Sequence, residues 1–203
     1  MAGWRTHRGK AVGLPIANID TDQLIPARFM SVPRVQGYGS YLLYDMRRDA
    51  TGAMRPDFPL NACPEASVLL AGRNFGSGSS REAAVYALVD AGIRAVIAPS
   101  FGDIFSANAV NNGLLPARVD EESHAAIETV LASGPQDISI AIDARSLAIG
   151  AVEVGFDLDD SWVTKLINGW DDIDLTRNHG AAIAAFKNTR NQTAAWAWPE
   201  AVD

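Results

Sequence analysis

A single run of alternating element types constrains the fold of this chain more than any other feature. Residues 66–71 are typical of a buried strand, 72–80 contain three glycines, 81–91 predict a helix that stops at Gly92, and 94–98 resemble a second buried strand. A strand, a turn, a helix and a strand within about thirty residues are typical of a βαβ unit, which requires a parallel strand pair and a right-handed crossover. The sequence therefore predicts an α/β fold.

The flanking segments continue this alternation. Asp103 and Asp120 stand where helix N-caps are expected, and Gly113 and Gly134 stand where those helices would end. Isoleucines alternate with small or polar residues at 138–142, as in a half-buried strand. We therefore expect a sheet covered by helices. The expected helices are 103–112, 120–133, 161–168 and 181–187, and the expected strands are 10–16, 114–119, 138–142 and a last one that ends at Val154.

Two segments do not fit this pattern. Residues 32–61 contain several prolines and glycines, which predict a long, mobile loop at about 32–60 rather than a long helix or a central strand. Its tyrosines and leucines suggest contact with a partner or a substrate, because long loops in compact domains are usually functional. The tail at about 188–203 carries Trp196 and Trp198, whose rings either cover the core or meet a partner chain, and we favour core cover.

Composition sets the class of protein. With 203 residues, of which 48% are hydrophobic, the chain predicts one domain spanning 1–203. A net charge of −7 argues against a nucleic-acid partner, and no apolar run approaches the ~18 residues that cross a bilayer, so we expect a cytoplasmic protein without a membrane partner. Cys63 is the single cysteine, which excludes an iron–sulfur cluster held by this chain alone. The histidines lack metal-ligand spacing, so we expect no metal ligand here.

The glycine-rich stretch at 74–82 is the segment that carries chemistry. Glycines let the backbone approach a ligand where a helix begins, and the unpaired N–H groups of the first helical turn attract anions. Arg81 adds a planar fork that matches a carboxylate or a phosphate, and a serine hydroxyl in this field has its alkoxide form stabilised. The pattern is typical of an anion site next to a serine base.

A purely structural interpretation is equally compatible with the pattern alone. Ser79 and Glu82 have the spacing of a capping box, which starts many helices without any ligand. The stretch is not a Walker A loop, because no Gly-Lys-Ser/Thr follows, and it is a poor dinucleotide fingerprint, because Arg81 stands where the third glycine belongs. The residues leave an anion site and a well-capped turn as alternatives.

Several blocks along the chain have a recognisable order and spacing. From about residue 10 to 187 they resemble the small subunits of 3-isopropylmalate dehydratase, a family related to the swivelling carboxy-terminal domain of aconitase. The resemblance implies a three-layer α/β swivel domain with a mixed sheet and flanking helices, whose partner is a large subunit that holds a [4Fe–4S] cluster. The blocks are Asn-Ile-Asp-Thr-Asp-Gln-Leu-Ile-Pro-Ala-Arg-Phe at 18–29, Asn-Phe-Gly-x-Gly-Ser-Ser-Arg-Glu at 74–82, Ala-Pro-Ser-Phe-x-Asp-Ile-Phe at 98–105, Asn-Gly-Leu-Leu-Pro at 112–116, Asn-Gly-x-Asp-Asp-Ile at 168–173 and Ala-x-Ile-Ala-Ala-Phe at 181–186.

The resemblance also implies roles for individual residues. Ser79 matches the serine that removes the carbon-bound proton, and Asp22 matches an aspartate of the active-site shell. The implied reaction is a dehydration and rehydration that converts 2-isopropylmalate to 3-isopropylmalate in leucine biosynthesis. Residues implied to bind the hydroxy-dicarboxylate substrate are Arg81, Ser80, Gly78 and, more weakly matched, Arg28.

Two departures from the family pattern leave alternatives open. Ser77 replaces the usual cysteine of the motif and Ala83 replaces its histidine, although neither is the expected base or the expected arginine. A related enzyme acting on a citramalate-, dimethylmalate- or homoaconitate-type acid would keep Ser79 and Arg81 while changing their surroundings. A non-catalytic anion-binding subunit is the alternative from another class, and the intact Asp22, Ser79 and Arg81 argue against it.

Overall fold

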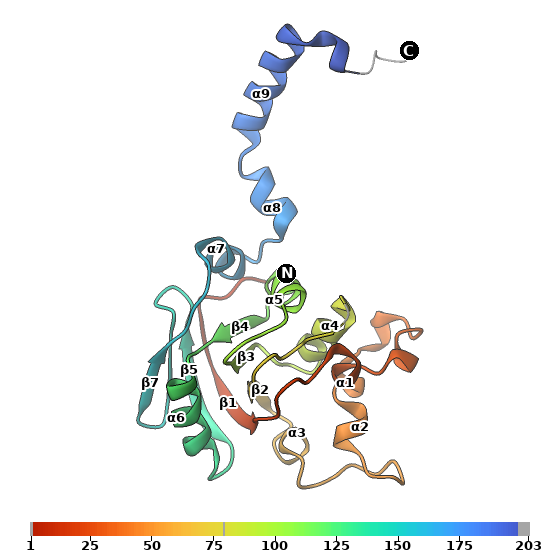
Figure 1. The fold of residues 1–203 in the computed structure, drawn as a ribbon, viewed down its shortest axis with the longest axis vertical. Coiled ribbons are helices and arrows are strands. Elements are labelled where there is room, and N and C mark those ends of the chain that lie inside the picture. Colours follow the sequence, from red (N-terminus) through yellow and green to blue (C-terminus); the bar gives the residue numbers. More distant parts are fainter. Residues whose placement is uncertain (1, 79, 199–203) are drawn as a thin grey trace.

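The computed structural model describes residues 2–78 and 80–198 and contains, within them, one mixed seven-stranded sheet (Figure 1). The strand order is β4-β3-β2-β1-β5-β6-β7. Helices alternate with the strands β1 to β5, as the sequence predicts. The strands are β1 (Thr6–Leu14), β2 (Ala66–Ala71), β3 (Ala95–Ala98), β4 (Leu115–Arg118), β5 (Gln136–Ala141), β6 (Ser146–Ile149) and β7 (Val152–Gly155). The main helices are α4 (Glu82–Asp90), α5 (Asp103–Asn111), α6 (Glu121–Leu131), α7 (Asp160–Asn168), α8 (Asp172–Arg177) and α9 (Gly180–Thr193).

Strand β1 joins two differently built halves of the sheet. On one side it pairs in parallel with β2, and Val12 lies opposite Leu69. On the other side it pairs antiparallel with β5, and Arg8 lies opposite Ser139. The parallel half continues through β3 and β4, whereas β5, β6 and β7 form an antiparallel meander. The predicted βαβ unit is therefore confirmed as β2–α4–β3.

The sheet separates two hydrophobic clusters, because successive side chains of a strand point to opposite faces. Val12, Leu69 and Val96 pack on one face against α4 and the segments between β1 and β2. Val68, Leu70 and Ile97 pack on the other face together with α6, α7 and the meander. Helices thus cover both faces of the sheet, and the expected three-layer α/β architecture is confirmed.

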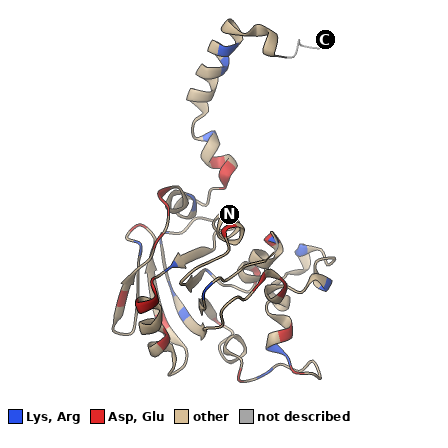
Figure 2. Ribbon diagram, in the orientation of Figure 1, with Lys and Arg blue, Asp and Glu red and all other residues tan. Residues whose placement is uncertain are grey.

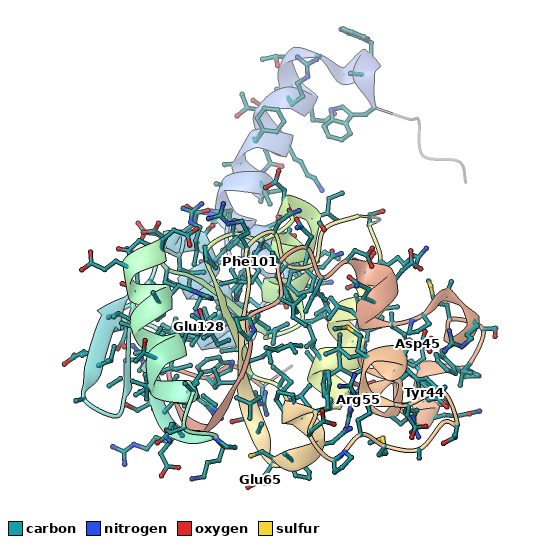
Figure 3. The ribbon with its side chains drawn as sticks, turned by 60° about the horizontal axis from the view of Figure 1, so that its bottom comes forward. Tyr44, Asp45, Arg55, Glu65, Phe101 and Glu128 are labelled. Carbon is teal, nitrogen blue, oxygen red and sulfur yellow. The ribbon has the colours of Figure 1, made fainter. Side chains whose placement is uncertain are left out.

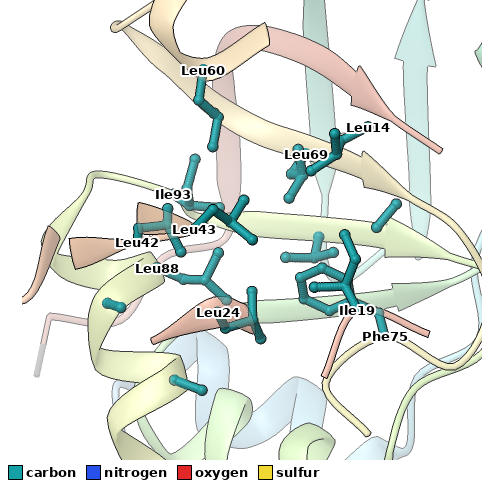
Figure 4. Packing of buried hydrophobic residues seen from close by; sticks show 14 of the residues in the cluster. Leu14, Ile19, Leu24, Leu42, Leu43, Leu60, Leu69, Phe75, Leu88 and Ile93 are labelled. Carbon is teal, nitrogen blue, oxygen red and sulfur yellow. The ribbon is translucent and has the colours of Figure 1, made fainter. Parts of the chain in front are cut away.

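The segment at 32–60 is irregular, as expected, with helices of only three or four residues, and part of it packs onto the body. Leu42 and Leu43 are fully buried beside Leu24 of α1 and Leu88 of α4 (Figure 4). Leu42 and Leu43 therefore pack in the protein's own core and do not face a partner. The short helices between β1 and β2 are α1 (Thr21–Leu24), η1 (Ala27–Phe29), η2 (Arg34–Gln36), η3 (Gly39–Tyr41), α2 (Tyr44–Arg47) and α3 (Pro59–Ala62).

Two further local predictions need correction, and one helix was not predicted. The single strand expected to end at Val154 is a hairpin, because Gly150 adopts φ +57° between β6 and β7. The N-cap of α5 is Gly102 rather than Asp103. A helix that we did not predict, α8, begins after Asp171, whose carboxylate accepts a hydrogen bond from the Asp174 amide.

The C-terminal segment extends away from the body instead of covering it (Figure 1). Helix α9 is longer than the expected 181–187 and includes the first part of the expected tail, and η4 (Ala195–Ala197) follows it. Trp196 is 84% exposed and Trp198 is 38% exposed, so the prediction that these rings cover the core is wrong. No helix among residues 2–78 and 80–198 is long and apolar enough to cross a membrane.

Candidate functional site

The glycine-rich turn lies where β2 ends and is joined to the segment that follows β1. The Gly76 amide donates to the carbonyl of Ile19 at 2.7 Å, and the Thr21 amide donates to the carbonyl of Ser77 at 3.0 Å. Because β1 and β2 are parallel, their carboxyl ends meet at the same edge of the sheet. Two motifs more than fifty residues apart in the sequence therefore form one surface.

Gly76 is required by both its backbone conformation and its surroundings. Its φ is +72°, and a Cβ atom placed on it would lie 2.2 Å from Cγ of Phe105. Phe105 in turn packs edge to face on Phe75, with ring centroids 5.4 Å apart. The turn is thus held tightly against the start of α5, which fixes the residues that follow it.

Two asparagines brace the turn, and the sequence analysis assigned neither of them a role. The Asn74 side-chain amide donates to Oδ1 of Asn18 at 2.8 Å, and the Asn74 backbone amide donates to Oγ of Ser100 at 2.8 Å. Asn18 and Asn74 have φ of +58° and +59°, a conformation that asparagine tolerates better than most residues. Each asparagine stands two residues before an Asp or a Gly, Asp20 and Gly76, which was the available signal of a turn.

Asp22 and Arg81 form an ion pair across the joined motifs. Arg81 is mostly enclosed, with 22% of its side chain exposed, whereas Asp22 is 55% exposed. Asp22 lies in the first turn of α1, whose start is fixed because the Asp20 carboxylate accepts from the Gln23 amide at 2.8 Å. An ion pair with the half-open Asp22 uses only part of the five-donor fork of arginine. Asp22 thus holds the Arg81 guanidinium in place, and the remaining donors of Arg81 are left for a ligand that comes from solvent.

Helix α4 does not begin with the capping box that its sequence suggested. Its N-cap is Arg81, and Glu82 is the first helical residue instead of the third. The Arg81 side chain makes no capping hydrogen bond to the helix. The Glu82 carboxylate instead accepts from the Asn112 side-chain amide at 2.8 Å, a contact with the end of α5 that the sequence did not reveal. The start of α4 thus has no cap from the Arg81 side chain, and its N–H groups attract anions in competition with the charge of Glu82.

The other residues expected in the site have different fates. Gly78 has φ +96°, and a Cβ on it would lie 3.6 Å from both Cβ of Asp20 and Oγ1 of Thr21, which places the turn against the start of α1. Ser80 is exposed. Ser79 lies outside the described residues. The structure therefore brings Asp22, Arg81 and Gly78 into one region, and the role of Ser79 stays a prediction.

Arg28 is held in another contact. Its guanidinium forms an ion pair with Asp45 and lies 4.6 Å from the ring centroid of Phe29 and 5.5 Å from that of Tyr44. Tyr44 and Asp45 lie at the edge of the body, away from Phe101 (Figure 3). The hydrogen bonds between Arg28 and Asp45 raise the pKa of Arg28 and lower that of Asp45. The predicted substrate contact of Arg28 would require this pair to open.

Within its described part the chain offers no set of ligands for a metal cluster. Among the residues that the structure describes, no group of three or more His, Cys, Asp or Glu side chains could hold a metal ion. Cys63 is buried, and this burial raises the pKa of its thiol, which disfavours the thiolate that binds metal. The residues do not fit an iron–sulfur cluster of their own.

Comparison with known proteins gives a consistent family. The family model for the aconitase C-terminal domain matches residues 1–122. The 3-isopropylmalate dehydratase small subunits of Shouchella clausii and Caulobacter vibrioides are 44% and 43% identical to this chain, over 92% and 93% of it and 96% and 95% of their own lengths. The fold is similar to that of 3-isopropylmalate dehydratase from Methanocaldococcus jannaschii, with a TM-score of 0.64, 24% identity, and coverage of 89% of this chain and 98% of that one. The chain therefore belongs to the family of 3-isopropylmalate dehydratase small subunits.

Proposed function

We propose that this chain is the small subunit of a hydro-lyase that interconverts 2-isopropylmalate and 3-isopropylmalate in leucine biosynthesis. It would act only together with a large subunit, as the names of its relatives imply. The proposal depends above all on the ion pair between Arg81 and Asp22, which joins the two motifs that match this family. Arg81 is mostly enclosed at the start of α4, where its guanidinium is placed to bind a substrate carboxylate.

In the proposed reaction, Arg81 binds a substrate carboxylate and Asp22 orients the guanidinium. Two parallel hydrogen bonds from the guanidinium would fix the orientation of the carboxylate as well as neutralise its charge. The N–H groups at the start of α4 and the glycine turn add to the attraction of the anion. The carboxylate would enter from the solvent side of the pair, where Asp22 is half exposed.

The chemistry consists of one elimination and one addition of water. The Ser79 hydroxyl, as an alkoxide, takes the proton from carbon while the hydroxyl leaves the adjacent carbon, which gives an alkene diacid. Water then adds in the opposite sense: the proton joins the carbon that lost the hydroxyl, and the hydroxyl joins the carbon that lost the proton. No atoms are gained or lost overall, and no oxidant or reductant is needed.

The large subunit supplies what this chain lacks. We propose that it carries a [4Fe–4S] cluster, since the single buried cysteine of this chain cannot bind one. The cluster would serve as a Lewis acid for the substrate hydroxyl. This chain would contribute carboxylate binding and the proton-transferring serine.

A second candidate function keeps the reaction and changes the acid. Ser77 and Ala83 differ from the family pattern, and both are half buried next to the glycine turn and the start of α4. Ala83 also packs against the hydrophobic cluster, where the family pattern has a larger, polar histidine. A citramalate-, dimethylmalate- or homoaconitate-type acid would then be the substrate.

The test is anaerobic turnover of the chain assembled with the large subunit of its own genome. The panel consists of 2-isopropylmalate, citramalate, dimethylmalate and homocitrate, and the alkene intermediate is followed by absorbance. We expect the highest kcat/KM for 2-isopropylmalate, and a higher value for another acid would replace the substrate assignment.

A pair of arginine variants tests the site itself. Arg81→Lys keeps the charge but loses the fork, and we expect kcat/KM to fall about 100-fold, or about 2.7 kcal/mol. Arg73→Lys is the matched control, because Arg73 also pairs with an acid, Glu121, but on an exposed surface. Full turnover by Arg81→Lys would remove the proposed carboxylate clamp, and loss of turnover in Arg73→Lys would show that arginine replacement alone harms the protein.

A further inference from the structure

Residues 172–198, here called the C-terminal arm, project from the body (Figure 1). Every residue from 176 to 193 is exposed, including the whole of α9. An isolated helix of this length is marginal in water, since helices shorter than about 12–15 residues gain most of their stability from tertiary packing. Among the described residues only η4 folds against α9, and no residue of α9 is buried.

The arm exposes large apolar side chains. Phe186 is 68% exposed, Ile183 is 36% exposed and Trp196 is 84% exposed. Ile183 and Phe186 are three residues apart in α9 and share a helical face with Lys187 and Arg190. Apolar surface of this kind on a protruding element is characteristic of a protein–protein interface.

The base of the arm is anchored to the body. Lys165, which is buried in α7, forms an ion pair with Asp172, the first residue of α8. Asn111 at the end of α5 donates to the other oxygen of Asp172 at 3.0 Å and accepts from Lys165 at 3.1 Å. The direction in which the arm leaves the body is thus fixed by side-chain contacts.

The anchor lies next to the candidate site. Asn111 holds the arm through Asp172, and its neighbour Asn112 holds Glu82 at the start of α4, directly after Arg81. Two asparagines adjacent in the sequence therefore contact the base of the arm and the first residue of α4, which follows Arg81 in the chain. A partner that covers the open side of the Arg81–Asp22 pair to complete the site would lie beside the arm.

Beyond its base, which carries Asp172 and Asp174, the arm has a charge opposite to that of the whole chain. Residues 175–198 contain Arg177, Lys187 and Arg190 and no acidic residue, whereas the chain has a net charge of −7. Figure 2 shows acidic residues at the base of the arm and only basic ones beyond it. The arm therefore suits a partner surface with an apolar groove and an acidic rim.

We infer that the C-terminal arm is the docking element for the large subunit, with Phe186 and Ile183 in an apolar groove and Lys187 and Arg190 against acidic residues at its edge. This inference rests on the proposed function for the existence of that subunit. A match over 92% of the chain leaves out about 16 residues, so the alignment with the Shouchella clausii small subunit reaches at least to Lys187. The arm up to Lys187 is thus shared with a protein named for its pairing with a larger chain.

Binding of the full-length chain to the large subunit of the same genome tests the inference without any turnover. Phe186→Glu places a charge on the apolar face of α9, and we expect the Kd measured by calorimetry to rise at least tenfold. Ala185→Glu is the matched control, because it introduces the same residue at the neighbouring position on another face of the helix, and its Kd should stay within twofold. The thermal midpoint of the isolated chain should be unchanged in both variants, since α9 contributes nothing to the core.

Three outcomes would overturn the inference. Phe186→Glu could bind the large subunit as tightly as the unaltered chain does. Both variants could weaken binding equally, which would show that α9 has no specific docking face. The isolated chain could form a dimer by light scattering that Phe186→Glu dissolves, which would make a second copy the occupant. A complex that forms with the expected Kd pattern but turns over no acid would refute the proposed function and leave the docking role standing.

Discussion

Replacement of Gly76 by alanine tests whether the glycine turn is fixed by the contact that the structure shows. The new Cβ would lie 2.2 Å from Cγ of Phe105, far inside van der Waals contact, while φ stays at +72°. A left-handed conformation costs a non-glycine residue about 1–2 kcal/mol, and overpacking of a tight core adds about 1–3 kcal/mol. We expect a loss of about 3 kcal/mol in the free energy of unfolding.

The matched control is Gly52→Ala, because Gly52 has φ +86° and nothing within 4 Å of its would-be Cβ. It should lose only the conformational part, about 1 kcal/mol. Urea unfolding of both variants separates the two terms, and a 3 kcal/mol loss lowers the thermal midpoint by about 6–12 °C for a chain of this size. If Gly76→Ala and Gly52→Ala unfold within about 0.5 kcal/mol of each other, Phe105 does not confine the turn and the steric argument fails.

Three other predictions follow from burial and charge. Leu42→Ala should cost about 2–5 kcal/mol in urea unfolding, because this residue is fully buried, whereas a mobile loop would give almost no change. Burial lowers the pKa of His7, and Arg94 adds to the effect. The free energy of unfolding should therefore be at its full value above about pH 6.5 and fall below it, because the unfolded chain takes up the proton first. His7→Gln should flatten this pH dependence, and an unchanged slope would contradict the prediction. The hydrogen bond from Lys165 holds the pKa of Asp172 below its ordinary value. The stability that this pair provides is therefore present above about pH 4 and is lost in stronger acid, as the carboxylate is protonated. Asp172→Asn should remove this part of the acid-unfolding curve, and a curve that keeps its shape would contradict the pairing.

The parallel half of the sheet could be predicted because its signals are local. The apolar run of β2 is found at the predicted residues, and Gly92 ends α4 with φ +90° as a helix stop does. Residues 32–60 could not be predicted in this way, because their helices are only three or four residues long and are stabilised by burial, not by propensity. Leu43, for example, is fully buried with φ +50°, a conformation that no local preference of leucine would suggest.

The site was predicted as a set of residues but not as an arrangement. The sequence pointed to the glycine-rich stretch, and the family resemblance added Asp22, but their contact depends on the parallel pairing of β1 with β2. The bond between Glu82 and Asn112 depends on how α4 and α5 cross, which no spacing in the sequence reveals. The exposed tryptophans were misplaced because an apolar residue looks the same in a sequence whether it covers the chain's own core or faces away from it.

The position of β1 in the sheet has a consequence for synthesis. This strand is made before both of its partners, β2 and β5, which are complete only at Ala71 and Ala141. At about 5–20 residues per second, a ribosome needs roughly 6–25 seconds to add the intervening residues, and folding of a helix takes about a microsecond. Both edges of β1 are therefore exposed to the cell for seconds, and chaperones that shield unpaired strands would be most useful during that interval.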